Sequence, residues 1–117
     1  MILAITRAVS PAIERCEITF AAPGPIDYQR AVSQHSAYER ALRDAGCSHQ
    51  RLPAADQHPD GVFVEDAAIV LDEVAVITRP GAASRRGEVT SVASLLSNYR
   101  PLAGIQNPGT LDGGDVL

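Results

Sequence analysis

Two adjacent carboxylates, Glu65 and Asp66, interrupt an apolar stretch of the sequence. The stretch "VFVEDAAIVL" (62–71) otherwise has the composition of a buried strand. Because an unpaired carboxylate is costly to bury, we expect a cation to lie opposite these side chains and opposite Asp60, which precedes Gly61. A pocket for a guanidinium or ammonium group is one interpretation, and a set of solvated turn and strand-end acids is the other.

A second charged cluster is "SRRGE" (84–88), at the start of a predicted helix. Arg85 and Arg86 occupy the end of that helix where its dipole disfavours cations. An arginine there is explained if an anion is shared between its guanidinium and the free amides of the helix. The alternative is a loop arginine that pairs with Glu88.

A third cluster, "GTLDGGDVL" (109–117), surrounds Asp112 and Asp115 with glycines. Glycines let a backbone or a ligand approach closely, although acids of this kind also occur in ordinary turns. Taken together, the three clusters provide carboxylates at one end of a site and Arg85 at the other. That polarity suits a zwitterionic amino acid with a cationic side chain, whose guanidinium and amine would meet the carboxylates.

The clusters lie between strands and helices that alternate along the chain. In the first half, strands are predicted at 2–6 and 49–53. Between them, Asp27 is expected to cap a helix that runs to about Ala45, where Gly46 provides a left-handed end. Apolar residues spaced by three or four positions support this helix.

The second half repeats the plan. A helix is predicted over about 85–98, and the predicted strands are 62–65, 67–71, 73–78, 102–106 and 115–117. "LAITRAVS" (3–10) resembles "VAVITRPGA" (74–82), and each opens a strand, loop, helix and strand in turn. A repeat of this length predicts α/β modules arranged about an axis, as in a propeller. Two such modules do not close a ring, so the chain is expected to be a fragment.

Composition restricts the class of protein. With 117 residues, 45% hydrophobic and 21% charged, the chain is typical of one soluble globular domain. A net charge of −4 and a pI near 5.2 argue against nucleic-acid and anionic-membrane partners. The N-terminus lacks the features of a signal peptide, and the two cysteines suit a reducing cytoplasm better than a disulfide framework.

The cysteines and histidines do not form a recognisable reactive or metal site. Neither Cys16 nor Cys47 lies in an electropositive setting that would favour a thiolate. His35 falls on the apolar stripe of the first helix and is expected in the core, whereas His49 and His58 are expected near the surface. Their spacing is not that of metal ligands, so no metal is predicted.

Four segments resemble the N-terminal part of the dimethylarginine dimethylaminohydrolases: "IDYQRAVSQHSAYERAL", "PDGVFVEDAAIV", "VITRPGAASRRGE" and "PGTLDGGDVL". The resemblance extends over essentially all of the chain. It implies the pentein fold, a five-bladed α/β propeller of ββαβ modules. About two of these modules would be present here, at 1–58 and 59–117, as the N-terminal portion of a single domain.

The resemblance also implies an activity without cofactors. Nω,Nω-dimethylarginine and Nω-methylarginine would be hydrolysed to citrulline and dimethylamine or methylamine, in the cytoplasm. A cysteine attacks the guanidinium carbon, a histidine acts as acid and base, and a carboxylate orients the histidine. In the family this cysteine and histidine lie beyond residue 117, so the chain alone is expected to be inactive.

The resemblance assigns seven positions of this sequence to the site. Asp112 matches the acid of the catalytic triad, and Arg85 matches one of two arginines that hold the α-carboxylate of the substrate. The other implied substrate-binding residues are Ile18 (through its backbone carbonyl), Asp60, Phe63, Glu65 and Asp66. The sequence departs from the family at Phe20, in the lid, where a histidine is usual.

Two other functions remain open. One is an arginine deiminase or related guanidino hydrolase, because the sequence does not distinguish methylated from free arginine. The other is a non-catalytic half-protein that binds a guanidino compound and assembles with another chain or with itself. In each case the expected partner is a small guanidino amino acid, with a homo-oligomer as one form of the protein.

Overall fold

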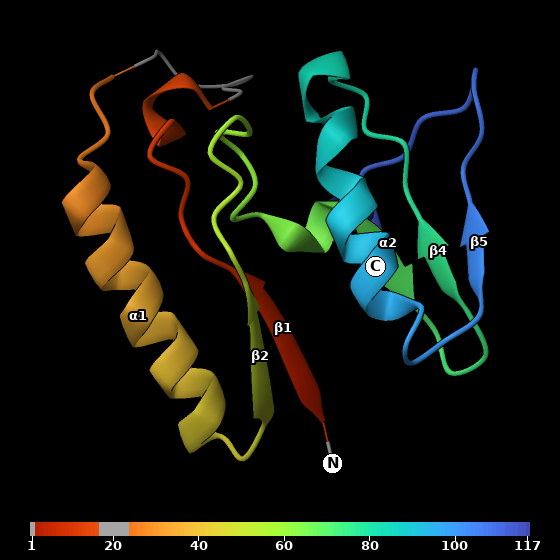
Figure 1. Cartoon of the computed structure of the whole chain (residues 1–117), viewed down its shortest axis with the longest axis horizontal. Helices are drawn as coiled ribbons and strands as arrows, with labels where there is room; N and C mark the ends of the chain where they lie inside the picture. The colour runs from red at the N-terminus through yellow and green to blue at the C-terminus, as the bar shows by residue number, and fades with distance from the viewer. Residues whose placement is uncertain (1, 17–23) are drawn as a thin grey trace. The chain divides into compact units, whose positions relative to one another are not determined.

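A computed structural model describes residues 2–16 and 24–117 of the chain. The chain divides into two compact units, Met1–Val62 and Phe63–Leu117, and each is described by itself (Figure 1). Both combine strands with a helix, as predicted. Within the described ranges, no helix is long and apolar enough to cross a membrane.

The unit Met1–Val62 is a β-α-β arrangement. Strand β1 (Leu3–Arg7) leads through a short 3₁₀ turn, Ile13–Arg15, to helix α1 (Tyr28–Asp44), and β2 (Ser48–Leu52) follows. The strands pair in parallel, with Leu3 opposite Ser48 and Arg7 opposite Leu52. Figure 1 shows α1 running beside the two strands. The strands and the helix predicted in this half are confirmed.

Both ends of α1 carry the predicted signals. The carboxylate of Asp27 accepts a hydrogen bond from the backbone amide of Arg30 at 3.1 Å, which satisfies one free amide of the first turn. At the other end Gly46 has a φ of 94°, a conformation that other residues rarely adopt. Its amide bonds to the carbonyl of Arg43 at 2.9 Å and closes the helix.

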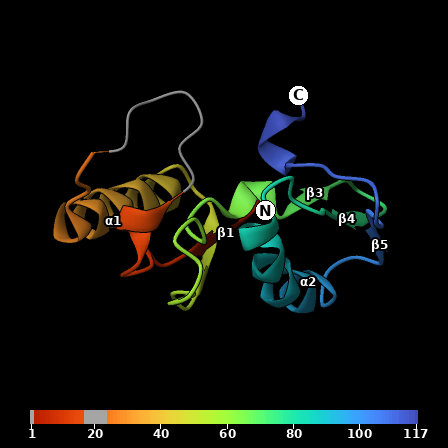
Figure 2. The same cartoon turned by 90° about the horizontal axis from the view of Figure 1, so that it is seen from above.

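The unit Phe63–Leu117 is a ββαβ module. Its sheet has the order β3-β4-β5, in which β3 (Ala68–Val70) pairs antiparallel with β4 (Ala75–Ile77). Helix α2 (Val89–Leu96) connects β4 to β5 (Leu102–Gly104), and these two strands are parallel. Figure 2 shows α2 on one side of the sheet and a terminal 3₁₀ turn, Gly113–Asp115, on the other.

Apolar residues of α2 and of the sheet form the core of this unit. Val92, Leu95 and Leu96 are at most 8% exposed, and Ala75 of β4 and Ala67, just before β3, are also buried. Removing side chains of the size of valine and leucine from water contributes about 1.5–3 kcal/mol each. The buried face of α2, which carries Val92, Leu95 and Leu96, therefore packs against β3 and β4.

Three boundaries differ from the prediction. The expected strand at 62–65 is a 3₁₀ turn, Val64–Asp66, in which the amide of Ala67 bonds to the carbonyl of Val64 at 3.1 Å. The expected last strand at 115–117 is replaced by the turn Gly113–Asp115. The second helix begins at Val89, because a 3₁₀ turn, Ala83–Glu88, precedes it.

These differences have a common cause. A regular strand would send Glu65 and Asp66 to opposite faces, whereas a turn lets the backbone and side chain of Asp66 form separate hydrogen bonds. The alternation of apolar residues in the sequence gives no information about such local bonds. Both segments that were wrongly predicted as strands, 62–65 and 115–117, contain acids, which are disfavoured in strands.

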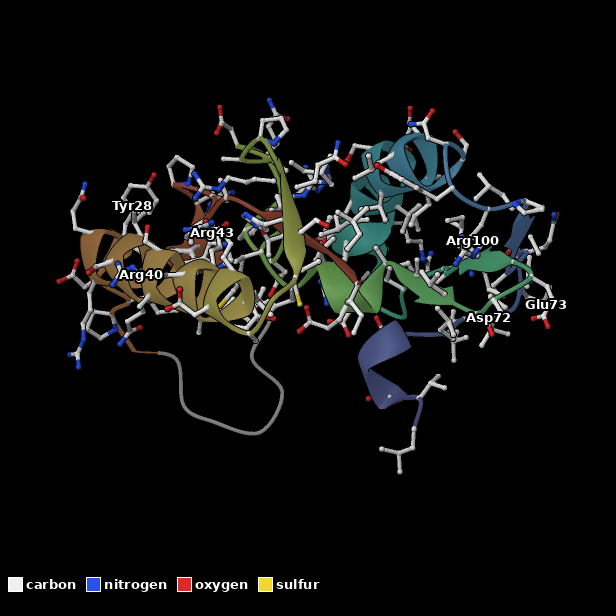
Figure 3. The ribbon with its side chains drawn as sticks, turned by 90° about the horizontal axis from the view of Figure 1, so that it is seen from below. Tyr28, Arg40, Arg43, Asp72, Glu73 and Arg100 are labelled. Carbon is white, nitrogen blue, oxygen red and sulfur yellow. The ribbon has the colours of Figure 1, made fainter. Side chains whose placement is uncertain are left out.

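Arginine side chains of this unit donate hydrogen bonds to backbone carbonyls in several loops. Arg79 Nη1 donates to the carbonyl of Gly109 at 3.1 Å, and Arg86 Nε donates to that of Pro80 at 2.9 Å. Arg100 Nε donates to the carbonyl of Leu71 at 3.1 Å, near the β3–β4 turn that carries Asp72 and Glu73 (Figure 3). Arg79 and Arg100 thus fasten segments distant in sequence, and Arg86 holds the loop that precedes it.

Candidate functional site

The side chain of Asp66 connects three segments of the unit Phe63–Leu117. Its Oδ2 accepts a hydrogen bond from Arg85 Nη1 at 2.8 Å, and its Oδ1 accepts one from the backbone amide of Gly114 at 2.9 Å. The carbonyl of Asp66 accepts a third from Thr78 Oγ1 at 2.7 Å. With 21% of its side chain exposed, the carboxylate is largely removed from solvent and is held by charge-assisted bonds.

The glycines after Asp112 allow this approach. A Cβ atom on Gly113 would collide with the carbonyl oxygen of Glu65, and one on Gly114 would collide with Asp66 Oδ1. The terminal turn therefore packs directly against the turn Val64–Asp66, at a distance that only glycine permits. The glycine-rich third cluster and the acidic first cluster thus meet.

Arg85 is enclosed by acceptors. Its Nε and Nη2 donate to Glu88 at 3.1 and 3.0 Å, and Nη2 is also 3.5 Å from the carbonyl of Phe63. Only 10% of its side chain is exposed. Burial works against the charge, but hydrogen bonds to Glu88 and Asp66 raise the pKa of Arg85 above its usual value. The sequence left two interpretations of Arg85, a shared anion or a pairing with Glu88, and the structure shows the pairing with Glu88.

Asp112 lies at the junction of two other segments. Its Oδ2 accepts a hydrogen bond from the backbone amide of Gly81 at 3.3 Å. The preceding residue, Leu111, forms an isolated antiparallel bridge with Arg79, whose carbonyl it bonds at 2.8 Å. This bridge fixes the backbone at the start of the terminal turn, and thereby the position of the Asp112 side chain.

The structure brings five of the seven predicted residues into one connected region, and Phe63 joins it through its backbone carbonyl. The acid pair 65–66 contacts the glycines that follow Asp112, and Arg85 binds both Asp66 and the carbonyl of Phe63. The Phe63 side chain itself is 42% exposed. Asp60 belongs to the other unit, where it is 4% exposed. Ile18 lies outside the described residues, as does Phe20.

The charge of this region favours a cationic ligand. Carboxylates outnumber guanidinium groups by four to one among its residues Glu65, Asp66, Arg85, Glu88 and Asp112. Asp66 already binds one guanidinium, that of Arg85, with the geometry of a charge-assisted bond. Among residues 2–16 and 24–117, no group of three histidine, cysteine or acidic side chains is arranged to hold a metal ion.

A second charged network, in the unit Met1–Val62, was missed by sequence reasoning. Glu39, on α1, is fully buried. Its Oε1 accepts hydrogen bonds from Thr6 Oγ1 at 2.8 Å and from Arg51 Nε at 2.9 Å, and its Oε2 pairs with Arg51 Nη2. Burial by itself would raise the pKa of Glu39, but the bonds from Arg51 and Thr6 lower it to about 2.

Two histidines border this carboxylate. His35, one helical turn before Glu39, places Nε2 at 3.1 Å from Oε1. His49 Nε2 is 2.8 Å from Thr6 Oγ1, and Arg43 Nη1 is 3.0 Å from His49 Nδ1. The available signals were the spacing of His35 and Glu39 and the alternation of His49 and Arg51 on one strand face. His35, with 13% of its side chain exposed, lies beside the Glu39 carboxylate.

Comparison with known proteins identifies what the chain is similar to. It is 41% identical over 96 residues to the N(G),N(G)-dimethylarginine dimethylaminohydrolase of Pseudomonas aeruginosa, covering 80% of this chain and 38% of that protein. It is 41% identical over 115 residues to the protein of the same name from Streptomyces coelicolor, covering 97% of this chain and 45% of that one. No protein-family model matches the chain.

A solved structure shares the fold. The crystal structure of a dimethylarginine dimethylaminohydrolase adduct with S-methyl-L-thiocitrulline superposes with a TM-score of 0.92 at 36% identity, over 97% of this chain and 45% of that one. The resemblance predicted from the four sequence segments is thereby confirmed, and so is the mixed α/β fold of pentein type. The chain spans less than half the length of the curated relatives named here.

Proposed function

We propose that the chain is part of a hydrolase that converts Nω,Nω-dimethylarginine to citrulline and dimethylamine, and Nω-methylarginine to citrulline and methylamine. The observation that carries this proposal is the Asp66 carboxylate, which binds a guanidinium group within a region rich in acids. The similarity to two bacterial dimethylarginine dimethylaminohydrolases supports the same substrate class.

Each site residue has a role that follows from its charge. Glu65 and Asp66 would accept hydrogen bonds from the substrate guanidinium, and Asp60 would bind the α-amine. Arg85 would bind the substrate α-carboxylate, and Phe63 would form part of the pocket wall. The backbone carbonyl of Ile18 would contact the substrate amine, and Asp112 would be the acid of the triad. Because Arg85 is paired with Glu88 and Asp66, a substrate carboxylate would compete with these two side chains.

The reaction needs two groups in addition to Asp112. A cysteine thiolate adds to the guanidinium carbon, and the C–N bond to dimethylamine breaks as a histidine supplies a proton to the leaving nitrogen. Water then adds to the S-alkylthiouronium carbon, the histidine removes its proton, and the C–S bond breaks to release citrulline. Asp112 would hold the histidine in the orientation that both proton transfers require.

The test is an assay of the protein encoded by the complete reading frame. With asymmetric dimethylarginine we expect citrulline and dimethylamine in equal amounts, and from the 117-residue chain alone we expect neither. The variant Asp66→Asn should lower kcat/KM by at least about tenfold, as expected for a lost charged hydrogen bond. Asp72→Asn, an exposed acid of the same unit, should leave the activity unchanged.

The other two functions predict different results in the same experiments. An arginine deiminase would release ammonia from free arginine and leave dimethylarginine intact. A guanidino-binding half-protein would give no product with either compound, but calorimetry would detect arginine or citrulline binding to the 117-residue chain.

We further propose that the protein acts in the cytoplasm and associates with itself. Sedimentation of the whole protein tests the self-association.

A further inference from the structure

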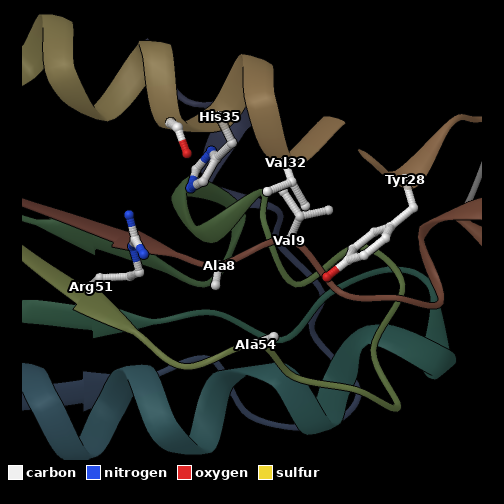
Figure 4. A pocket seen from close by; sticks show the side chains of 8 residues that line it. Ala8, Val9, Tyr28, Val32, His35, Arg51 and Ala54 are labelled. Carbon is white, nitrogen blue, oxygen red and sulfur yellow. The ribbon is translucent and has the colours of Figure 1, made fainter. Parts of the chain in front are cut away.

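A hollow of about 130 Å³ lies in the unit Met1–Val62, beside α1 and the segments that follow β1 and β2. Figure 4 shows the side chains around it. A water molecule occupies about 30 Å³ in the liquid, so the space corresponds to a ligand of roughly four to six non-hydrogen atoms. Every lining residue belongs to this one unit, and none is among the residues assigned to guanidino hydrolysis.

One wall of the hollow presents a guanidinium group. Arg51 uses Nε and Nη2 to bind Glu39, which is buried behind it. For its remaining nitrogen, Nη1, the described part of the chain shows no hydrogen-bond partner, and half of the side chain is exposed. The pairing with Glu39 fixes the plane of the guanidinium, so that less rotational freedom is lost when Nη1 binds a ligand.

The other walls determine what kind of ligand fits. Val9, Val32 and Ala54 supply apolar surface, and His35 lines the hollow as well as Arg51. Figure 4 shows Tyr28 at the end of the hollow away from Arg51, with its hydroxyl directed inward. A ligand would therefore place an acceptor at Arg51 and a short hydrocarbon body against the two valines.

The charge of the network selects a monoanion. Nη1 of Arg51 can donate charge-assisted hydrogen bonds to a carboxylate, which favours an acid group over a neutral amide. A phosphate dianion would bring a second negative charge toward Glu39, whose carboxylate lies directly behind Arg51 and is ionised above pH 2 or so. A cation would meet the guanidinium itself. Only a singly charged anion with a small apolar body satisfies all of these surfaces.

We propose that this hollow binds small aliphatic monocarboxylates, through Arg51 at one end and apolar contacts with Val9, Val32 and Ala54. The site is additional to the guanidino-binding function and does not depend on it. It gives the Met1–Val62 unit a ligand of its own, of a class with no guanidinium and no α-amine.

The experiment titrates the 117-residue chain with propionate and, separately, with propionamide, its neutral isostere, and follows backbone amide shifts by NMR. Propionate should shift amides around Val9, His35 and Arg51 in a saturable way, with at least about tenfold weaker binding of propionamide. Equal binding of the two compounds, or shifts that do not saturate in this region, would overturn the proposal.

Variants separate the hollow from general charge effects. Ala54→Leu fills the space without touching the ion pair and should abolish propionate binding, and Arg51→Gln should weaken it by at least about tenfold. Arg40→Gln removes an equal charge from an exposed position of α1, and this variant should bind propionate as tightly as the unaltered chain does. If Arg51→Gln does not fold, Ala54→Leu decides, and undiminished binding by that variant would refute the site.

Discussion

Asp66 Oδ2 lies 2.8 Å from Arg85 Nη1, and this ion pair joins the 3₁₀ turn Val64–Asp66 to the 3₁₀ turn Ala83–Glu88. The other oxygen of the same carboxylate receives the amide of Gly114. Three segments that are distant in sequence therefore depend on one side chain. The region around Asp66 is consequently sensitive to changes that alter either its charge or the space beside it.

Asp66→Asn is expected to destabilise the chain by about 2 kcal/mol. An amide has one acceptor oxygen where the carboxylate has two, so either the Arg85 bond or the Gly114 bond is lost. Urea denaturation followed by circular dichroism measures the difference. Asp72→Asn, at the exposed β3–β4 turn, is the control, and a similar change in both variants would contradict the role assigned to Asp66.

Alanine at Gly113 or Gly114 is expected to separate the terminal turn from the turn Val64–Asp66. The new methyl group would collide with Glu65 backbone in the first case and with the Asp66 carboxylate in the second, at a cost of about 1–3 kcal/mol each. Gly104→Ala is the matched control, because its Cβ would be 3.8 Å from the nearest atom. Unfolding midpoints that are the same for all three variants would show that the two turns do not pack as described.

Glu39 is expected to make the chain less stable in acid. Its pKa is lowered from 4.5 to about 2 in the folded chain, so its contribution is complete above pH 4.5 and is lost as the pH falls toward 2. A shift of this size corresponds to about 3 kcal/mol. Urea unfolding at a series of pH values between neutral and 2 measures the loss.

The variant Glu39→Gln isolates this contribution from that of the other acids. It should be less stable at neutral pH, because Arg51 and Thr6 lose a charged partner, but its stability should fall less steeply below pH 4.5. Parallel pH dependences in the variant and in the unaltered chain would mean that Glu39 does not titrate between these limits.

His49 is expected to carry its single proton on Nε2 when the ring is neutral. Arg43 can only donate, so Nδ1 must accept, and Nε2–H then donates to Thr6, whose hydroxyl donates to Glu39. A long-range ¹H–¹⁵N spectrum distinguishes the two tautomers. A proton on Nδ1 in the neutral ring would exclude this hydrogen-bond chain.

Removing the Arg43 donor should shift the tautomer ratio of His49. One hydrogen bond of about 1 kcal/mol changes such a ratio roughly fivefold, so Arg43→Ala should give a measurable population of the other tautomer. Arg40→Ala, on the same helix and exposed, should leave the ratio unchanged (Figure 3).

The elements with strong local signals could be predicted from the sequence. The Asp27 carboxylate and the Gly46 amide limit α1 through hydrogen bonds to backbone groups three positions away, and these bonds are present. The helix predicted over about 85–98 is likewise present as α2, which begins at Val89 and ends at Leu96. By contrast, Val64–Asp66 was predicted as a strand, because its turn is stabilised by residues nineteen or more positions away, Arg85 and Gly114.

The candidate site was predictable as far as residue type and motif allowed. Asp66 and Arg85 lie side by side in one unit, and their roles toward a ligand stay a prediction; the pairing of Arg85 with Glu88 was one of two alternatives. Glu39 was not selected, because an acid on a helix is ordinarily solvated, and the spacing signals for it do not show that Arg51 from a following strand accompanies its burial. Spatial partners of this kind are not encoded in local spacing.

The guanidinium groups that fasten loop carbonyls affect how the protein can be probed chemically. Arg79, Arg86 and Arg100 each hold a backbone carbonyl of another segment, so derivatising them with a dicarbonyl such as phenylglyoxal would loosen loops as well as remove charge. Inactivation by such a reagent would then report damage to the scaffold as readily as blockage of Arg85. Protection by added substrate analogue, monitored by peptide mapping of each adduct, is needed to tell the two apart.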